Sequence, residues 1–278
     1  MPTPTVERGL HRHEGLTLHY REAGRGHAST LVLLHPSPRS SAMFEPWMAM
    51  LAPHLHVIAV DTPGYGGSDA LPTPPTQMAD YVAPLHALLA AIAGPRFMLY
   101  GSATGAQLGI AYALRHPQSV AHLLLDNAAH FDDAERAKML ARYFPDLTPR
   151  SDASHLQAAW QMCAGMLEFF PWFEANEAHR IAPQPPSAAA VHAAFSELMA
   201  AGPGYALAYR AAFEHERAEH VQALTVPTTL LRWRGSILLK HIARLCSFAL
   251  PPQLHVLDIP APLDERYAAM TAHLLALP

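Results

Sequence analysis

Histidine and cysteine are the residues of this chain that are best suited to metal binding or nucleophilic chemistry. The 19 histidines contrast with only two cysteines, Cys163 and Cys246, which form no Cys-x-x-Cys motif. The run HRHE (His11–Glu14) falls at an expected hairpin turn, where it would face solvent. The run HERAEH (His215–His220) resembles His-Glu-x-x-His, but its second histidine comes one residue too late to share a helix face with the first. We therefore expect reduced thiols, no metal site and no other cofactor.

Glycine spacing and charge exclude several further classes of function. The run GYGG (Gly64–Gly67) lacks the spacing of a dinucleotide-binding fingerprint or a P-loop. Only 15% of the 278 residues are charged, the net charge is −4, and no lysine- or arginine-rich tract is present. A nucleic-acid or membrane partner is therefore not expected. Without an apolar leader or spanning segment in the sequence, we expect a cytoplasmic protein; a homodimer is left open.

Alternating and continuous apolar runs indicate the elements that would position a site. Two alternating segments, Val6–His13 and Leu16–Glu22, flank Glu14-Gly15 and predict a hairpin. Compact apolar runs predict strands that are buried on both faces, as in a parallel sheet. Segments of helical length alternate with these runs, which favours a doubly wound α/β fold. The apolar runs are Leu31–His35, His56–Asp61, Phe97–Tyr100 and Ala121–Asp126, followed late in the chain by Thr228–Arg232 and Gln253–Leu257.

The strand–helix alternation stops after the sixth strand and resumes near residue 223. The intervening segment, 128–222, is rich in alanine, histidine and aromatic residues and reads as mostly helical. We therefore predict one core domain, formed by 1–127 and 223–278, with 128–222 inserted as a helical cap. An insertion at the carboxyl edge of such a sheet lies over the ligand crevice, so the cap is expected to act as a lid.

Three segments together resemble the α/β-hydrolase fold, in its capped branch of haloalkane dehalogenases, epoxide hydrolases and carbon–carbon bond hydrolases. They are a strand, loop and helix at Leu31–Ala52, the run DTPGYGGS within Val57–Pro72, and a strand, sharp turn, helix and strand at Phe97–Asn127. The resemblance covers nearly the whole chain. It implies a mostly parallel, doubly wound sheet with a helical cap inserted after the sixth strand.

The resemblance also implies a nucleophile elbow, Gly-x-Ser-x-Gly, whose central side chain faces the crevice. Here the turn is GSATG (Gly101–Gly105), so both glycines are present and the central residue is Ala103. A methyl group has no lone pair with which to attack a substrate. Ser102 comes one residue too early, and its side chain is expected to point away from the crevice. The conventional nucleophile is therefore missing.

The acid and the base of the family's triad are missing from their usual places as well. The segment after the cap aligns Ser236 with the usual acid position, and no Asp or Glu occurs from Val226 to Pro252. Some branches take the acid from the preceding strand end, where Asp126 stands. The stretch that usually carries the histidine, Leu257–Met270, contains none. Loss of both nucleophile and base is hard to reconcile with acyl transfer by the usual triad.

The family's oxyanion-binding groups are expected to remain. One donor would be the backbone N–H of Thr104, at the start of a helix whose dipole also favours an anion. The other would be the N–H of Ser37, because its neighbours Pro36 and Pro38 have none. A carbonyl, carboxylate or phenolate oxygen could dock there beside Ala103.

Several side chains could complete a ligand site, and each also has an ordinary structural interpretation. Arg39 could hold an anionic ligand or lie in solvent, and His130 could be a relocated base or a hydrogen-bonded linker residue. The cap aromatics could pack the cap or form an apolar wall; they are Trp160, Phe169, Phe170, Trp172 and Phe173. The predicted ligand-binding residues are Ser37, Arg39, Ala103, Thr104, His130, Trp160 and Trp172.

Three functions remain open at this point. The leading one is a protein that resembles small-molecule hydrolases but does not hydrolyse, and that binds a small apolar or aromatic molecule with a carbonyl or carboxylate. The second is a cofactor-independent lyase or isomerase, or a hydrolase with a relocated acid/base such as Asp126 or His130. The third is an interaction protein with a vestigial pocket, because one fold hosts many activities.

Overall fold

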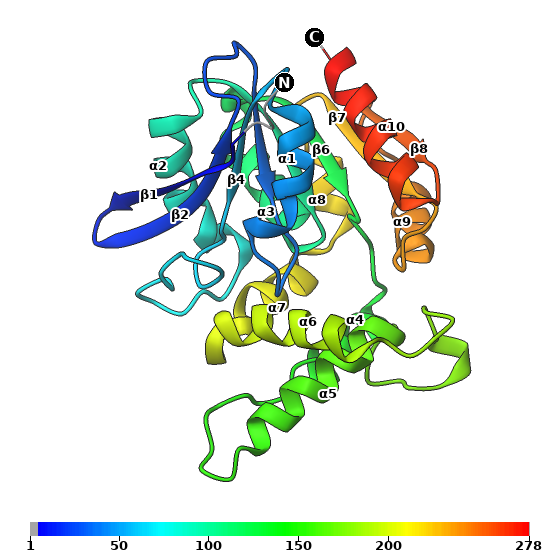
Figure 1. The fold of residues 1–278 in the computed structure, drawn as a ribbon. Helices are drawn as coiled ribbons and strands as arrows, with labels where there is room; N and C mark the ends of the chain where they lie inside the picture. The colour runs from blue at the N-terminus through cyan, green and yellow to red at the C-terminus, as the bar shows by residue number, and fades with distance from the viewer. Residues whose placement is uncertain (1–4, 278) are drawn as a thin grey trace.

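A computed structural model describes residues 5–277 of the chain. Within these residues, eight strands form one sheet in the order β1-β2-β4-β3-β5-β6-β7-β8. From β4 to β8 all neighbouring strands are parallel, whereas β2 pairs antiparallel with both β1 and β4. The predicted hairpin, the mostly parallel sheet and the α/β class are thus confirmed (Figure 1).

The strands lie where the apolar runs predict them. All residues of the two central strands β3 and β4 are buried, which explains why these runs show no polar alternation. The strands are β1 (Glu7–His13), β2 (Leu16–Ala23), β3 (Thr30–Leu34), β4 (His56–Val60), β5 (Phe97–Ser102), β6 (Val120–Asp126), β7 (Thr228–Trp233) and β8 (Leu254–Ile259).

Helices cover both faces of the sheet. Apolar residues of α1 (Glu45–Leu51) and α10 (Leu263–Ala276) share one core cluster with the sheet. Those of α2 (Val82–Ile92), α3 (Thr104–Arg115) and α8 (Ala218–Gln222) belong to the other. This two-faced burial is the layer pattern of a doubly wound fold.

The segment between β6 and β7 supplies the helices that gather beyond one end of the sheet (Figure 1). A third apolar cluster, which includes Tyr143, Met162 and Phe213, holds them together. The last helix of the segment, α8, packs instead in the sheet's own core. The helices are α4 (Asp133–Arg142), α5 (Ser154–Glu168), α6 (Ala188–Ala200), α7 (Ala206–His215) and α8, and after β7 the chain forms α9 (Leu239–Cys246).

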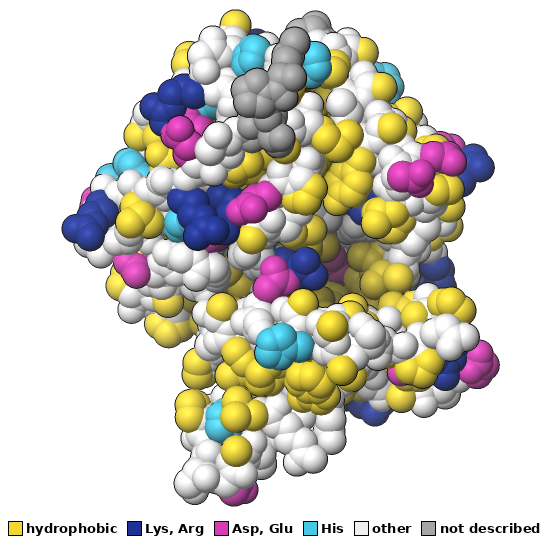
Figure 2. Space-filling model, viewed as in Figure 1, with side chains coloured by type: hydrophobic (Ala, Val, Ile, Leu, Met, Phe, Trp, Pro, Cys, Tyr) yellow, Lys and Arg dark blue, Asp and Glu magenta, His cyan; other side chains and the backbone are white. Residues whose placement is uncertain are grey.

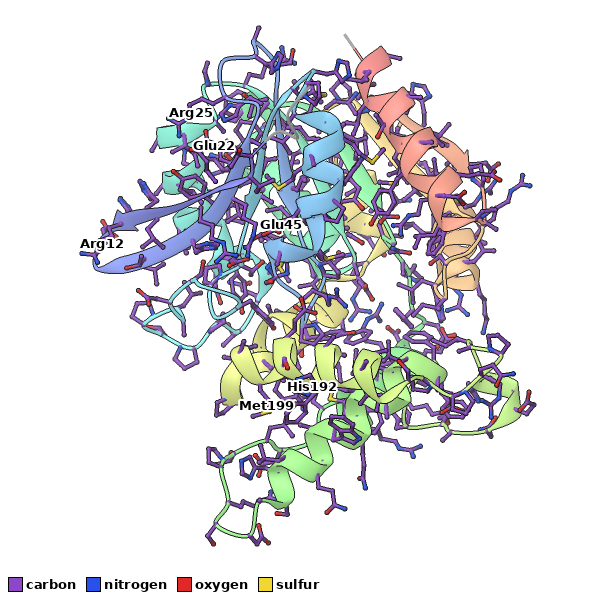
Figure 3. The ribbon with its side chains drawn as sticks, in the orientation of Figure 1. Arg12, Glu22, Arg25, Glu45, His192 and Met199 are labelled. Atoms are coloured by element: carbon purple, nitrogen blue, oxygen red, sulfur yellow. The ribbon has the colours of Figure 1, made fainter. Side chains whose placement is uncertain are left out.

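Two further findings concern the described residues. Among residues 5–277, no helix has the length and hydropathy that crossing a bilayer requires. Nor does the described part of the chain bring three or more His, Cys, Asp or Glu side chains together as a metal site. The HRHE run lies at the far end of the β1–β2 hairpin, where Arg12 points outward (Figure 3).

Candidate functional site

A sharp turn between β5 and α3 places Ala103 at the carboxyl end of the central sheet. Ala103 has φ 48° and ψ −110°, a conformation that non-glycine residues rarely adopt. The flanking glycines permit the turn because backbones approach closely there. A Cβ on Gly101 would lie 2.2 Å from the carbonyl oxygen of Gly105, and one on Gly105 would lie 2.2 Å from that of Leu34. The Ala103 N–H donates to the carbonyl of Asp126 at 2.9 Å, which anchors the turn to β6.

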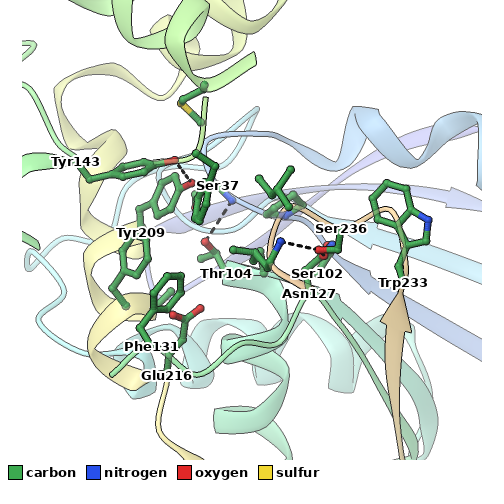
Figure 4. Close-up of a pocket in the computed structure, with 18 of the residues that line it drawn as sticks. Ser37, Ser102, Thr104, Asn127, Phe131, Tyr143, Tyr209, Glu216, Trp233 and Ser236 are labelled. Carbon is green, nitrogen blue, oxygen red and sulfur yellow. Dashed lines mark hydrogen bonds between the residues drawn. The ribbon is translucent and has the colours of Figure 1, made fainter. Parts of the chain in front are cut away.

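A cavity of about 330 Å³ lies above this turn, between the sheet and the helices inserted after β6 (Figure 4). Its walls are mostly apolar and aromatic, which is typical of small-molecule sites. Figure 2 shows the surface hollowed at the junction of these two parts, with hydrophobic side chains around the hollow. The lining residues include Pro36, Ser37, Ser102, Ala103, Thr104, Asn127, Phe131, Tyr143, Met166, Phe170, Tyr209, Ala212, Phe213, Glu216, Trp233, Ser236 and Leu238.

Ser102 lines the cavity, which differs from the expectation that it would point away. Its hydroxyl, however, is hydrogen-bonded to a carboxylate beneath the turn. Ser102 Oγ lies 3.0 Å from Oδ2 of Asp126, the fully buried residue that ends β6. The same carboxylate oxygen accepts from the Tyr100 hydroxyl at 2.7 Å and from the Arg266 guanidinium. Two hydroxyls and the partly buried Arg266 cation already bind Asp126, so this carboxylate serves the structure beneath the turn; it does not itself line the cavity.

Two polar side chains close one end of the cavity. The Ser236 hydroxyl donates to Oδ1 of Asn127 at 2.6 Å, and the Asn127 amide lies 3.4 Å from Ser102 Oγ (Figure 4). Ser236, at the position where the acid is expected, thus contributes a hydroxyl that is bound to an amide. Among the described residues no carboxylate lines this end, although Oδ2 of Asp126 accepts from the Asn127 amide at 3.2 Å beneath it.

The predicted oxyanion donors Ser37 and Thr104 both line the cavity, and they bind each other. The Ser37 N–H points at Oγ1 of Thr104, 3.3 Å away. Thr104 is the first residue of α3, so its own N–H has no partner within the helix. An acceptor beside Ala103 would therefore find the Thr104 N–H available and would compete with a threonine hydroxyl for the Ser37 N–H.

Glu216 is the one carboxyl group that lines the cavity in the described chain. Glu216 is only 5% exposed, and its buried Oε2 has no hydrogen-bond partner among the described residues. Burial raises the pKa of this carboxyl to about 8, against a smaller lowering effect of the Arg136 charge. At neutral pH Glu216 therefore holds its proton.

Two tyrosines complete the aromatic wall. The Tyr143 and Tyr209 hydroxyls lie 3.2 Å apart, within hydrogen-bond distance, on the same side of the cavity (Figure 4). Burial raises the pKa of Tyr143 to about 12 and that of Tyr209 well above 10. Both phenols stay neutral at physiological pH and act as hydrogen-bonding groups.

The family of this chain follows from a comparison with known protein families. The sequence model of the alpha/beta hydrolase fold matches residues 29–249, which is most of the chain. This chain belongs to the alpha/beta hydrolase fold family.

Two of the matched relatives, both at low identity, are named as hydrolases. An uncharacterised hydrolase of Saccharomyces cerevisiae is 28% identical over 120 residues, which cover 43% of this chain and 41% of that protein. Epoxide hydrolase 3 of Xenopus tropicalis is 29% identical over 121 residues, covering 42% of this chain and 32% of that protein. The chain therefore aligns with less than half the length of these curated relatives.

A solved structure shows the same fold over the full chain. Epoxide hydrolase A of Mycobacterium thermoresistibile superposes with a TM-score of 0.72 at 20% identity and covers 98% of each chain. At this identity the likeness shows the shared fold of the α/β hydrolases and no more.

Four of the seven predicted ligand-binding residues lie outside the cavity lining. Arg39 forms a 2.7 Å ion pair with Glu197 of α6. His130 packs its ring against Phe248, with centroids 4.7 Å apart, in the region of α9. These two side chains point away because nearby groups of other elements bind them.

The two cap tryptophans are also placed elsewhere. Trp160 is 37% exposed on α5 and lies beside Phe195 of α6, with ring centroids 5.7 Å apart. Trp172 donates its indole N–H to the carbonyl of Tyr143 at 2.9 Å and so supports the cap from outside the cavity. Of the five cap aromatics that were considered, Phe170 alone lines the cavity.

The residues that sequence reasoning missed come from the cap and its two connections to the sheet. Phe131, Tyr143, Tyr209, Phe213 and Glu216 line the cavity but carry no motif. The signal that was available for Glu216 was its place in HERAEH, a run that was considered only as a metal motif. Its place directly after a segment of helical length that carries Tyr209 and Phe213 was the remaining clue.

Proposed function

We propose that this α/β-hydrolase-fold protein binds a small, mostly apolar or aromatic molecule bearing a carbonyl or carboxylate, and does not hydrolyse it by nucleophilic attack from the elbow. The observation that carries the proposal is Ala103 at the apex of the turn, facing the cavity in a strained conformation. The neighbouring Ser102 hydroxyl binds Asp126. A methyl group at the apex leaves the family's reaction without an attacking atom.

The surroundings of the apex supply no general base either. No histidine occurs among the lining residues of the described chain. The Glu216 carboxyl is mostly protonated at neutral pH because burial raises its pKa to about 8, so only its minor ionised fraction can accept a proton from water there. Without a nucleophile at the apex and a histidine base beside it, the first step of the usual two-step hydrolysis, attack on the substrate, does not take place.

The remaining groups suit ligand binding. In this proposal the ligand's carbonyl or carboxylate oxygen accepts from the Thr104 N–H at the start of α3 and displaces the Thr104 hydroxyl from Ser37. The apolar body of the ligand packs against Phe131, Tyr209 and Phe213. A body of this kind gains roughly 25 cal/mol for each square ångström of apolar surface that it buries.

A second candidate function, a lyase or isomerase step, is favoured by Glu216. A carboxyl group whose pKa lies near the working pH can give and take a proton in one cycle. This group replaces Asp126 and His130 as the candidate acid/base, because neither of those lines the cavity. The binding test below applies to both candidates, since a substrate must also enter this cavity.

Thermal unfolding with and without ligand tests the proposal. Millimolar 4-phenylbutyrate and 4-phenylbutan-2-one should raise the Tm, whereas sorbitol at the same concentration should not. A ligand at a hundredfold excess over its Kd contributes about 2.7 kcal/mol to the free energy of unfolding. Ala212→Leu, which adds bulk to the cavity wall, should remove the shift, and Ala189→Leu on the exposed face of α6 should keep it. A Tm that no aromatic carbonyl or carboxylate moves, or that moves equally in Ala212→Leu, contradicts the proposal.

A further inference from the structure

Glu216 occupies an unusual place for a carboxyl group. Glu216 directly follows α7, is only 5% exposed, and lines the cavity among apolar side chains. Its Oε2 is completely buried without a partner in the described residues. A buried polar group that lacks a hydrogen bond costs free energy unless something else supplies the partner. This side chain therefore carries a desolvation cost that a hydrogen-bond partner would offset.

The nearest cation is already occupied. The Arg136 guanidinium, from α4, donates to the backbone carbonyls of Phe131, Phe213 and Glu216 and to the Asp133 carboxylate. None of these bonds reaches the Glu216 carboxyl. Because no described group partners this carboxyl and Glu216 lines the cavity, a molecule bound in the cavity can supply the missing partner.

We propose that Glu216 donates a hydrogen bond to an uncharged acceptor oxygen of the bound molecule, so that the cavity selects neutral acceptors over amines. This inference rests on the proposed function and adds to it the ligand chemistry at Glu216, whose neighbour His215 binds Gln107 in the first turn of α3. The acceptor could be a ketone, ether or hydroxyl oxygen, since each has a lone pair for an acid O–H.

The other titratable groups around Glu216 keep a fixed charge near neutrality. Arg136 on α4 is the neighbouring cation, and Arg217 is bound to Asp133. Tyr209 on α7 stays neutral because burial raises its pKa well above 10. His215 binds Gln107 of α3, and burial lowers its pKa to about 3, so it too stays neutral. Among these groups, only Glu216 changes its protonation state between pH 7 and 9.

An ammonium ligand is the rival, because aromatic faces can also stabilise a cation. An ammonium group would pair with an ionised Glu216, and the carboxyl would have to lose its proton on binding. Amine affinity would then rise with pH towards 8, whereas affinity for a neutral acceptor would fall above 8. The two chemistries predict opposite pH dependences.

Calorimetric Kd values for three isosteric probes test the proposal: 4-phenylbutan-2-one, 4-phenylbutan-2-amine and butylbenzene. The ketone should bind with the same Kd at pH 6 and 7 and about tenfold more weakly at pH 9, because its donor ionises with a pKa of about 8. The ketone should also bind more tightly than the amine at pH 7. Butylbenzene accepts no hydrogen bond, so its binding should not weaken tenfold between pH 7 and pH 9.

Variants separate the proton from the shape of the side chain. Glu216→Gln keeps a donor and should bind the ketone within about threefold of the parent at pH 7, with no weakening at pH 9. Glu216→Leu has no donor and should bind it about five- to tenfold more weakly at pH 7, in line with one neutral hydrogen bond. Glu197→Gln, on α6 and outside the cavity, should keep the full pH dependence.

The outcomes distinguish this inference from the function on which it rests. If the ketone binds with a Kd that is independent of pH, or if the amine binds more tightly and gains affinity up to pH 8, the inference about Glu216 is wrong and the binding function stands. If none of the three probes binds, both are wrong.

Discussion

At the scale of single residues, two side chains define this site: the methyl group of Ala103 and the carboxyl of Glu216. Ala103 keeps the strained conformation of the turn although its methyl side chain has no reactive group to present to the cavity. Such strain costs of order 1–3 kcal/mol and persists because the packing around the turn fixes it. Glu216 instead retains a proton because it is buried without a partner.

Restoring a hydroxyl at the apex should not restore hydrolysis. In Ala103→Ser the new hydroxyl would have no imidazole partner, because no histidine lines the cavity in the described residues. We expect the variant to remain unlabelled by a serine-directed fluorophosphonate and to release no 4-nitrophenol from its acetate ester above the buffer rate. Stoichiometric labelling within minutes would show that a base lies within reach after all.

The proton on Glu216 should also appear in the stability of the protein. Because the folded-state pKa is raised from 4.5 to about 8, the folded chain binds the extra proton between these values and loses stability as pH rises through them. Relative to Glu216→Gln, the parent should lose about 4 kcal/mol of unfolding free energy between pH 4.5 and 8, at about 1.4 kcal/mol per unit. Urea unfolding of both proteins at pH 5, 7 and 9 measures this.

Glu214→Gln, an exposed change on the same helix, is the control for that comparison. Its free energy of unfolding should follow the parent's at all three pH values. A constant difference between the parent and Glu216→Gln at all three would mean that Glu216 is ionised in the folded protein.

At the scale of elements, the site depends on how closely α3 approaches β3 and β5. Gly101 and Gly105 allow this approach, and the Asp126–Arg266 pair fixes β6 beneath it. The sequence predicted these elements well because their signals are local. Alternation marked the hairpin around Glu14-Gly15, and continuous apolar runs marked β3 and β4.

Gly105→Ala should disrupt this approach. The added Cβ would lie 2.2 Å from the Leu34 carbonyl oxygen, a backbone atom that yields only if the strand moves. We expect a loss of about 3 kcal/mol in the free energy of unfolding, at the upper end for overpacking. The matched change Gly204→Ala meets only the Leu207 side chain, at 3.6 Å, and should change stability by less than about 1 kcal/mol. Equal effects of the two changes in thermal unfolding would contradict this account of the turn.

At the scale of the whole molecule, the cavity lies above Ala103 where two parts meet, the sheet and the helices inserted after β6, and α7 contributes to the apolar clusters of both. One part is the sheet with its two helical layers, and the other is the cluster around Tyr143 and Phe213. The Arg39–Glu197 ion pair joins the loop after β3 to α6 at this junction. The two parts leave between them about 330 Å³ that neither fills.

At this junction, the sequence did not predict which side chains of the inserted segment line the cavity. Ser37, Ala103, Thr104 and Ser236 could be placed because they follow strands whose carboxyl ends must share one edge. Which way a cap residue points depends instead on how non-local helices pack. Trp172 binds the Tyr143 backbone and Glu216 enters the cavity for that reason, and neither orientation has a signature in its neighbouring residues.

The most direct test of the central claim is steady-state turnover of 4-nitrophenyl acetate, styrene oxide and 1-chlorohexane by the parent protein and by Ala212→Leu. The absence of an attacking atom at residue 103 predicts that both proteins release product at the buffer rate. A kcat/KM of the order of 10⁴ M⁻¹ s⁻¹ or more for any of the three, abolished in Ala212→Leu, would contradict it.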